Sequence, residues 1–183
     1  MNVDLVQKAL AFAVRKHGSQ MRRDENIPYV IHPIRVAELV RTHWSQDLDY
    51  YSAALLHDTL EDTQTTREEL LVEFGERIAT LVWHLTSDKA EIKRIGKATY
   101  LRGKVDSIPM SAAILKLCDR LDNIQSVKPE ITKDLWSKAY AEQTYYIFEG
   151  LQQIDKSVNY PQQRNLLRLI RVTLEEKGYP CPW

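Results

Sequence analysis

Cysteine, net charge and long apolar runs are scarce in this chain of 183 residues. Cys118 and Cys181 are its two cysteines, and they form no CxxC motif, so a disulfide scaffold is excluded and the reducing cytoplasm is the predicted location. No apolar run is long enough to span a bilayer, which predicts no membrane partner. Acidic and basic residues number 25 each, so no bulk charge favours nucleic acid. A small anionic ligand stays open, because a local cluster of Lys and Arg would serve it.

Apolar residues recur at helical spacing through most of the chain, and no segment shows the sustained alternation of a β-strand. The hydrophobic content of 44% is enough for a core of ordinary size. These patterns predict an all-α fold, a compact bundle in a single domain over residues 1–183. The predicted helices cover residues 3–17, 32–43, 49–62, 67–74, 76–86, part of 87–107, 108–127, 134–154 and 162–177.

The stretch "HDTLED", residues 57–62, places dense charge directly after the apolar run "YSAALL". His57 and Glu61 are four residues apart, as are Asp58 and Asp62, so a continuous helix would stack both pairs on one face. One interpretation is a solvated helix end, since charged runs usually face water. The other is a site where an imidazole and three carboxylates act together.

Two more polar residues stand in apolar surroundings. His32 follows "YVI" and precedes a proline at a predicted helix start, where a capping or core histidine is the ordinary alternative. Asp119 interrupts "AAILKLCDRL", and an ion pair with Arg120 or Lys116 is the ordinary alternative for it. A divalent cation would provide a partner for all of these side chains, because buried charges need one. The mixed nitrogen and oxygen ligands suit manganese, iron or zinc.

In this order, His32, the His57–Asp58 pair and Asp119 resemble the metal ligands of the HD superfamily of phosphohydrolases. The blocks "HGSQMRR…PYVIHPIRVAELV", "AALLHDTLEDT", "FGERIATLVWHLT" and "ILKLCDRLDNI" are similar to the hydrolase domain of RelA/SpoT-type alarmone enzymes, and most of all to the stand-alone small alarmone hydrolases. The resemblance covers residues 9–127 and continues more weakly to 151, with no synthetase domain. It implies an HD-domain helical bundle.

The resemblance implies hydrolysis of the 3′-pyrophosphate of guanosine tetraphosphate (ppGpp) or pentaphosphate (pppGpp), giving pyrophosphate and GDP or GTP. One Mn²⁺ ion would be bound by the four residues of the HD pattern. Glu61 and Asp62 match the catalytic acidic pair of the family, which would orient or deprotonate the attacking water. This agrees with general chemistry, because a bound cation lowers the pKa of its water and a nearby carboxylate takes the proton.

The same resemblance implies a nucleotide pocket. Arg22, Asn123 and Tyr140 match family residues that contact the ligand, and Lys97 lies in a basic stretch that would face the phosphates or only solvent. Asp122 departs from the family, whose members usually carry histidine or an aromatic residue there. Pointing into the pocket, its charge would repel a polyphosphate, whereas pointing outward it would matter little. The loop 23–27 also lacks the usual glycine.

Two other functions stay open. An enzyme of the same fold could use the same metal and acids on another phosphorylated nucleotide such as NADPH, and would then release orthophosphate. A non-catalytic HD module that binds a nucleotide is the second alternative, although the metal ligands and the acidic pair are all present here. The sequence leaves the oligomeric state undetermined.

Overall fold

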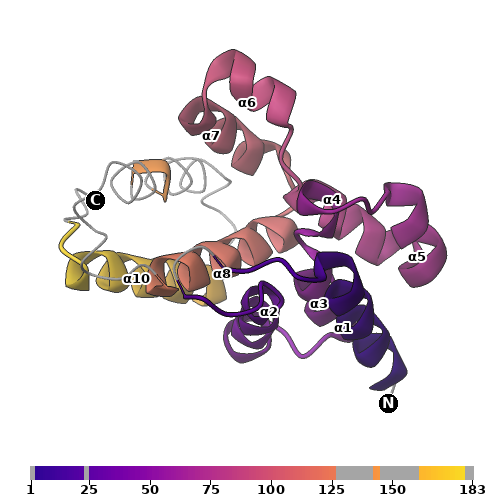
Figure 1. Ribbon diagram of the computed structural model, residues 1–183. Coiled ribbons are helices and arrows are strands. Elements are labelled where there is room, and N and C mark those ends of the chain that lie inside the picture. Colours follow the sequence, from indigo (N-terminus) through magenta and orange to yellow (C-terminus); the bar gives the residue numbers. More distant parts are fainter. Residues whose placement is uncertain (1–2, 23–24, 127–141, 145–160, 180–183) are drawn as a thin grey trace.

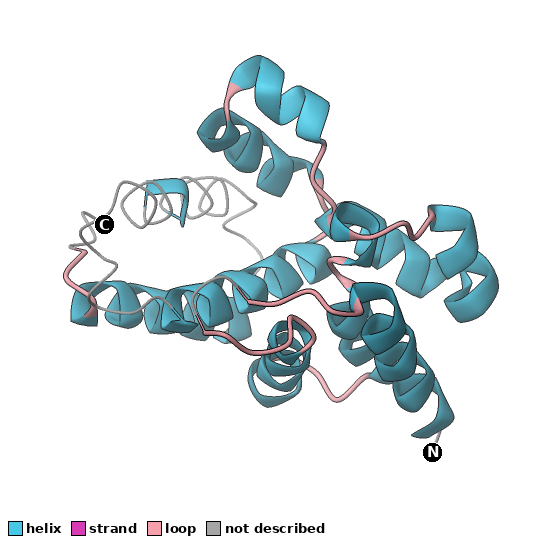
Figure 2. Cartoon of the chain, viewed as in Figure 1, coloured by secondary structure: helices cyan, strands magenta, loops and turns pink. Residues whose placement is uncertain are grey.

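The computed structural model describes residues 3–22, 25–126, 142–144 and 161–179. Within these ranges the chain is built from helices and contains no strand, only an isolated bridge between Met21 and Pro28, which confirms the all-α prediction (Figures 1 and 2). The helices are α1 (Val3–His17), α2 (Ile31–His43), α3 (Leu48–Leu56), α4 (Thr59–Asp62), α5 (Arg67–Leu85), α6 (Lys89–Ile95), α7 (Lys97–Ser107), α8 (Met110–Ser126) and α10 (Pro161–Glu176).

Two helices, α3 and α8, form the centre of the bundle. Helix α3 packs against α1, α2 and α5, while α8 packs against α2, α5 and α10 (Figure 1). More than half of the residues of each of these two helices are buried. Any polar side chain that α8 directs toward α2 or α3 is therefore removed from water.

Local signals in the sequence place several helix ends as predicted. Helix α1 ends before Gly18, whose φ of 53° lies in the left-handed region that glycine adopts easily. Thr66 caps α5, since its side chain accepts a hydrogen bond from the backbone N–H of Glu69. Gly75 (φ 81°, ψ 169°) kinks α5 at the predicted boundary between residues 67–74 and 76–86.

The predicted continuous helix over 49–62 is wrong. Helix α3 ends at Leu56, and the short α4 begins only at Thr59. The Thr59 hydroxyl donates to the Leu56 carbonyl at 2.7 Å, and such a side-chain bond competes with the helical ladder. His57 and Asp58 therefore occupy a turn between two helices, and the four charged residues do not share one helix face.

None of the helices in the described ranges has the length and apolar character that crossing a bilayer requires. The predicted helix over 162–177 is confirmed by α10. The predicted helix over 134–154 lies outside the described residues except for 142–144, which are helical.

Candidate metal centre

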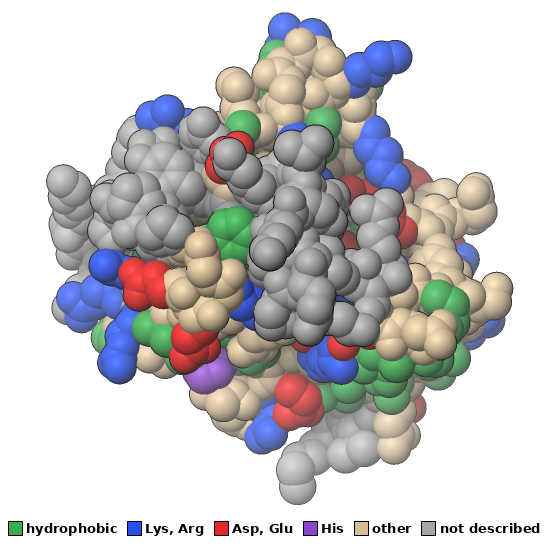
Figure 3. All heavy atoms as spheres, turned by 60° about the vertical axis from the view of Figure 1, so that its left-hand side comes forward, with side chains coloured by type: hydrophobic (Ala, Val, Ile, Leu, Met, Phe, Trp, Pro, Cys, Tyr) green, Lys and Arg blue, Asp and Glu red, His purple; other side chains and the backbone are tan. Residues whose placement is uncertain are grey.

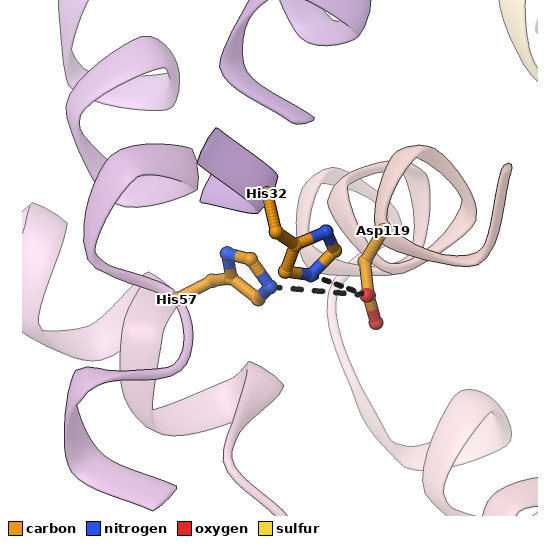
Figure 4. Close-up of side chains that lie close together, drawn as sticks. All are labelled: His32, His57 and Asp119. Carbon is orange, nitrogen blue, oxygen red and sulfur yellow. Dashed lines mark ion pairs between the residues drawn. The ribbon is translucent and has the colours of Figure 1, made fainter. Parts of the chain in front are cut away.

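Three side chains from distant parts of the chain converge in the interior. His32 comes from the first turn of α2, His57 from the turn after α3, and Asp119 from the middle of α8 (Figure 4). One ligand atom from each lies within 4.8 Å of the others, and all three residues are at most 6% exposed. The packing of α8 against α2 and of α2 against α3 thus brings together residues that are up to 87 positions apart in sequence.

The distances in this cluster suit one bound ion. The Nε2 atoms of His32 and His57 lie 3.3 and 3.8 Å from Asp119 Oδ1. They lie 3.5 and 3.0 Å from Asp58 Oδ2. Two ligand atoms bonded to one ion at about 2.1 Å are about 3.0 to 3.4 Å apart in octahedral or tetrahedral geometry. Asp58 Oδ2 therefore lies close enough to both imidazoles to serve as a further oxygen donor.

An orphaned nitrogen also indicates a ligand. His57 Nε2 is buried and has no hydrogen-bond partner with acceptable geometry among the described residues. Its other ring nitrogen, Nδ1, donates to the Ala54 carbonyl at 2.8 Å, which turns Nε2 into the cluster. A coordinate bond to a cation would satisfy this atom.

Asp122 points inward, but not as a free charge. Its Oδ2 accepts a hydrogen bond from His32 Nδ1 at 2.7 Å and one from Arg22 Nη2 at 3.2 Å. A carboxylate accepts only, so His32 carries its proton on Nδ1 and turns Nε2 toward Asp119. The sequence left the direction of Asp122 open, and the structure gives it two partners.

The electrostatics of the cluster are dominated by carboxylates. Burial lowers the pKa of both histidines, but Asp58 and Asp119 outweigh it and raise the pKa of His32 to about 10 and that of His57 to about 9, with Asp122 also contributing at His32. Burial raises the pKa of Asp58 and Asp119, yet the nearby positive charges bring both pKa values well below the usual range. The carboxylates are therefore ionised and ready to bind a cation.

The two carboxylate oxygens of Asp119 have different partners. Oδ1 faces the two histidines, whereas Oδ2 forms an ion pair with Lys116 Nζ at 2.8 Å. The predicted ion pair with Lys116 is thus confirmed, and the role of Asp119 as a metal ligand stays a prediction.

Tyr29 belongs to the same cluster and was not predicted from the sequence. Its hydroxyl donates to Asp58 Oδ2 at 2.6 Å, and its ring lies against His17 and His32 with centroid distances of 4.9 and 5.7 Å. In the sequence Tyr29 reads only as an apolar residue before α2. A buried tyrosine hydroxyl usually has a hydrogen-bond partner, so a tyrosine three residues before His32 could have been recognised as a candidate for this site.

Two of the predicted nucleotide contacts lie beside the cluster. Arg22 Nη1 donates to Asn123 Oδ1 at 3.1 Å, and Asn123 Nδ2 donates to Asp119. Arg22 Nε also donates to Glu25 Oε2 at 3.3 Å. In the loop that lacks the usual glycine, Asn26 adopts φ 53°, a conformation that Asn tolerates better than most residues.

The predicted acidic pair is divided between two surroundings. The Oε2 atom of Glu61 accepts a hydrogen bond from the Ser87 N–H at 2.9 Å. Asp62 is 40% exposed and lies 3.5 Å from Lys89 Nζ. Burial, Asp58 and Glu61 together raise the pKa of Asp62. Of the two, only Asp62 has a side chain with a substantial exposed fraction, and its pKa is raised.

The other two predicted nucleotide contacts are Lys97 and Tyr140. Lys97 is exposed at the start of α7, and loss of hydration together with the charges of Arg120 and Lys116 lowers its pKa. Basic side chains lie over α6 and α7 at the top of the molecule (Figure 3). Tyr140 lies outside the described residues.

Comparison with known proteins places this arrangement in context. Residues 9–153 match the HD domain family. The chain is 38% identical over 155 residues to the human guanosine-3′,5′-bis(diphosphate) 3′-pyrophosphohydrolase MESH1, covering 79% of this chain and 83% of that protein. It is 36% identical over 177 residues to mouse MESH1, covering 93% of both. An Aquifex aeolicus enzyme with the same activity name is 38% identical over 155 residues, but the match covers only 21% of that longer protein.

A solved structure has the same fold. The structure described as a metazoan ortholog of SpoT that hydrolyses ppGpp superposes with a TM-score of 0.80 and covers 97% of this chain and 98% of its own. Its sequence identity is 24%, so this likeness concerns the fold alone.

Proposed function

This chain belongs to the HD domain family, and from that membership we propose that it is a metal-dependent guanosine-3′,5′-bis(diphosphate) 3′-pyrophosphohydrolase. It hydrolyses the 3′-pyrophosphate of ppGpp or pppGpp, and the products are pyrophosphate and GDP or GTP. Residues 1–183 act as one HD-type domain in this proposal. The MESH1 relatives, which carry this activity in their names, match most of both chains.

The observation that carries the proposal is the convergence of His32, His57 and Asp119, with Asp58 beside them. A mixed set of imidazoles and carboxylates suits a divalent catalytic ion and does not resemble a thiolate structural site. We assign these four residues as ligands of one Mn²⁺ ion. When bound, the ion lowers the pKa of a water molecule and polarises the phosphoryl oxygen.

The carboxylates of Asp58, Asp119 and Asp122 all lie within 3.5 Å of the imidazole nitrogens of His32. A divalent cation bound there would add positive charge where an anionic substrate has to approach. We assign Arg22, Asn123 and the exposed Lys97 to the nucleotide, together with the predicted contact Tyr140.

Glu61 and Asp62 have different tasks in this proposal. Asp62 accepts the proton of the attacking water, since its carboxylate is accessible and the pKa shift makes it a better base. Glu61 fixes α4 through its bond to the Ser87 N–H and so holds Asp62 in position. General-base catalysis of this kind contributes about 10²- to 10⁴-fold to a rate.

Product analysis with ppGpp and Mn²⁺ tests the proposal. The wild-type protein is expected to release GDP and pyrophosphate. Asp62→Asn is expected to lower kcat by about 10²- to 10⁴-fold without changing the affinity for Mn²⁺. Glu61→Gln, the matched control, keeps a hydrogen-bond acceptor for Ser87 and is expected to lose much less activity.

Three results would contradict the proposal. Orthophosphate released from another nucleotide, without turnover of ppGpp, would indicate the related phosphatase activity. Saturable nucleotide binding without any turnover by the Mn²⁺-loaded protein would indicate a non-catalytic module. Full activity of Asp62→Asn would remove Asp62 from the mechanism.

A further inference from the structure

Asp122 is a buried carboxylate that joins two parts of the site. Its side chain is 3% exposed, and one oxygen, Oδ2, receives hydrogen bonds from both His32 Nδ1 and Arg22 Nη2. An ionised carboxylate is costly to bury unless such partners are present. The residue is therefore retained in the interior by one bond to α2 and one bond to the loop before it.

The bond to His32 orients a proposed metal ligand. With Nδ1–H held at 2.7 Å, the ring turns Nε2 to within 3.3 Å of Asp119 and 3.5 Å of Asp58. His57 makes the corresponding bond to the backbone carbonyl of Ala54 instead. A charged acceptor increases the basicity of an imidazole more than a neutral carbonyl does, so the two histidines are different ligands.

The bond to Arg22 positions a proposed substrate contact. Arg22 is held on one side by Asp122 and Asn123 of α8 and on the other side by Glu25 of its own loop. The Arg22 side chain is 12% exposed, and its guanidinium bonds to Asp122, the partner of His32. The same pairing neutralises Asp122, so this carboxylate does not present a free negative charge to a polyphosphate.

We propose that Asp122 is a positioning residue that orients His32 toward the metal ion and holds Arg22 beside it. This inference rests on the proposed function. Asp122 contacts neither the ion nor the substrate, and it acts through two side chains that do. It makes the metal affinity and the affinity for the nucleotide depend on one carboxylate, since both partners share its Oδ2.

Two variants separate the two roles. Asp122→Asn keeps the size of the side chain and one oxygen but removes the charge, and the expected result is Mn²⁺ affinity weaker by about 10- to 100-fold in calorimetric titrations. Glu25→Gln, the matched control, loosens Arg22 from the opposite side without touching His32. We expect Glu25→Gln to bind Mn²⁺ like the wild type. Both variants are expected to raise KM for ppGpp, because both loosen Arg22.

A measurement on the wild-type protein keeps the test independent of how the variants fold. In Zn²⁺-loaded protein with ¹⁵N-labelled histidine, His32 is expected to carry its proton on Nδ1 and to bind the metal through Nε2. Metal bound at Nδ1 would overturn the inference. Equal Mn²⁺ affinities of the wild type and Asp122→Asn would overturn only the inference about Asp122 and would leave the proposed function intact. Absence of Mn²⁺ binding by the wild type would overturn both.

Discussion

Replacing Asp119 with asparagine removes a negative charge that two sets of partners share. Oδ1 faces the histidines of the metal cluster, and Oδ2 pairs with Lys116 Nζ at 2.8 Å. The substitution therefore has two separate effects. It removes a proposed metal ligand, and it leaves the ammonium of Lys116 without its counter-charge in the interior.

The second effect can be given a magnitude from the geometry. The side chains of Asp119 and Lys116 are 8% and 14% exposed, so the pair is largely buried. Removing one partner of a buried pair costs about 3–5 kcal/mol. The flexible stem of lysine lets its ammonium move toward water, which places this pair at the lower end, about 3 kcal/mol. In urea this is a midpoint shift of about 1 M, for an unfolding slope of about 3 kcal/mol per M.

Lys116→Met provides the partner variant for a double-mutant cycle. It leaves Asp119 beside the histidines, so we expect it to cost only about 1 kcal/mol in the metal-free protein. The double variant is expected to cost about 2 kcal/mol, well below the sum of the single variants, which is a coupling of about 2 kcal/mol. Urea unfolding of the metal-free proteins measures these values.

Metal binding distinguishes the two roles of Asp119. Lys116→Met is expected to bind Mn²⁺, whereas Asp119→Asn and the double variant are expected to lose it, even though the double variant recovers stability. A coupling below about 0.5 kcal/mol would refute the buried ion pair. Wild-type Mn²⁺ affinity in Asp119→Asn would refute the assignment of Asp119 as a ligand.

Three further predictions concern the stability of the metal-free protein. Tyr29→Phe removes the hydrogen bond to the Asp58 carboxylate and should cost about 1.5–3 kcal/mol in urea unfolding, so an unchanged midpoint would contradict that bond. Burial lowers the pKa of the cluster histidines, but carboxylates outweigh it and raise the pKa of His32 to about 10 and that of His57 to about 9. Both exceed the ordinary value of 6.5, so their stabilisation is complete below pH 6.5 and is lost as the pH rises through 9 and 10. Urea midpoints measured between pH 6 and 10 should fall accordingly, and midpoints that rise would contradict the shifts. Gly75→Ala places alanine at φ 81°, where its Cβ meets no atom within 4 Å, so backbone strain alone should cost about 1–3 kcal/mol, and an unchanged melting temperature would contradict it.

The helices of this protein follow from local features of the sequence. Apolar spacing, a capping threonine at position 66 and glycines 18 and 75 predicted where α1 and α5 begin, kink or end. These signals act within one or two turns, so they can be read without knowledge of the fold. His32 and Asp119 were also recognisable as site residues, because a single polar residue among apolar neighbours needs a partner.

The division of the segment 49–62 could not be read in this way. Its residues favour a helix throughout, yet the chain turns at His57 and Asp58, where the Thr59 hydroxyl bonds to the Leu56 carbonyl. After that turn, Glu61 lies in a separate short helix, and its carboxylate accepts a hydrogen bond from the Ser87 N–H, 26 residues away in the sequence. Spacing along the chain indicated which residues are charged, but not where their side chains point.

The sequence alone thus determined the helical class, most helix boundaries and the residue types of the candidate metal centre. Only the tertiary structure decided the partners of Tyr29 and Asp122, which bond to side chains 29 and 90 residues away. Such partners are chosen when α2, α3 and α8 pack against one another, since every buried polar group must then find an acceptor or donor within about 3 Å. Which groups can satisfy that requirement depends on the residues that lie close together in the folded protein, and the periodicity of the sequence does not reveal them.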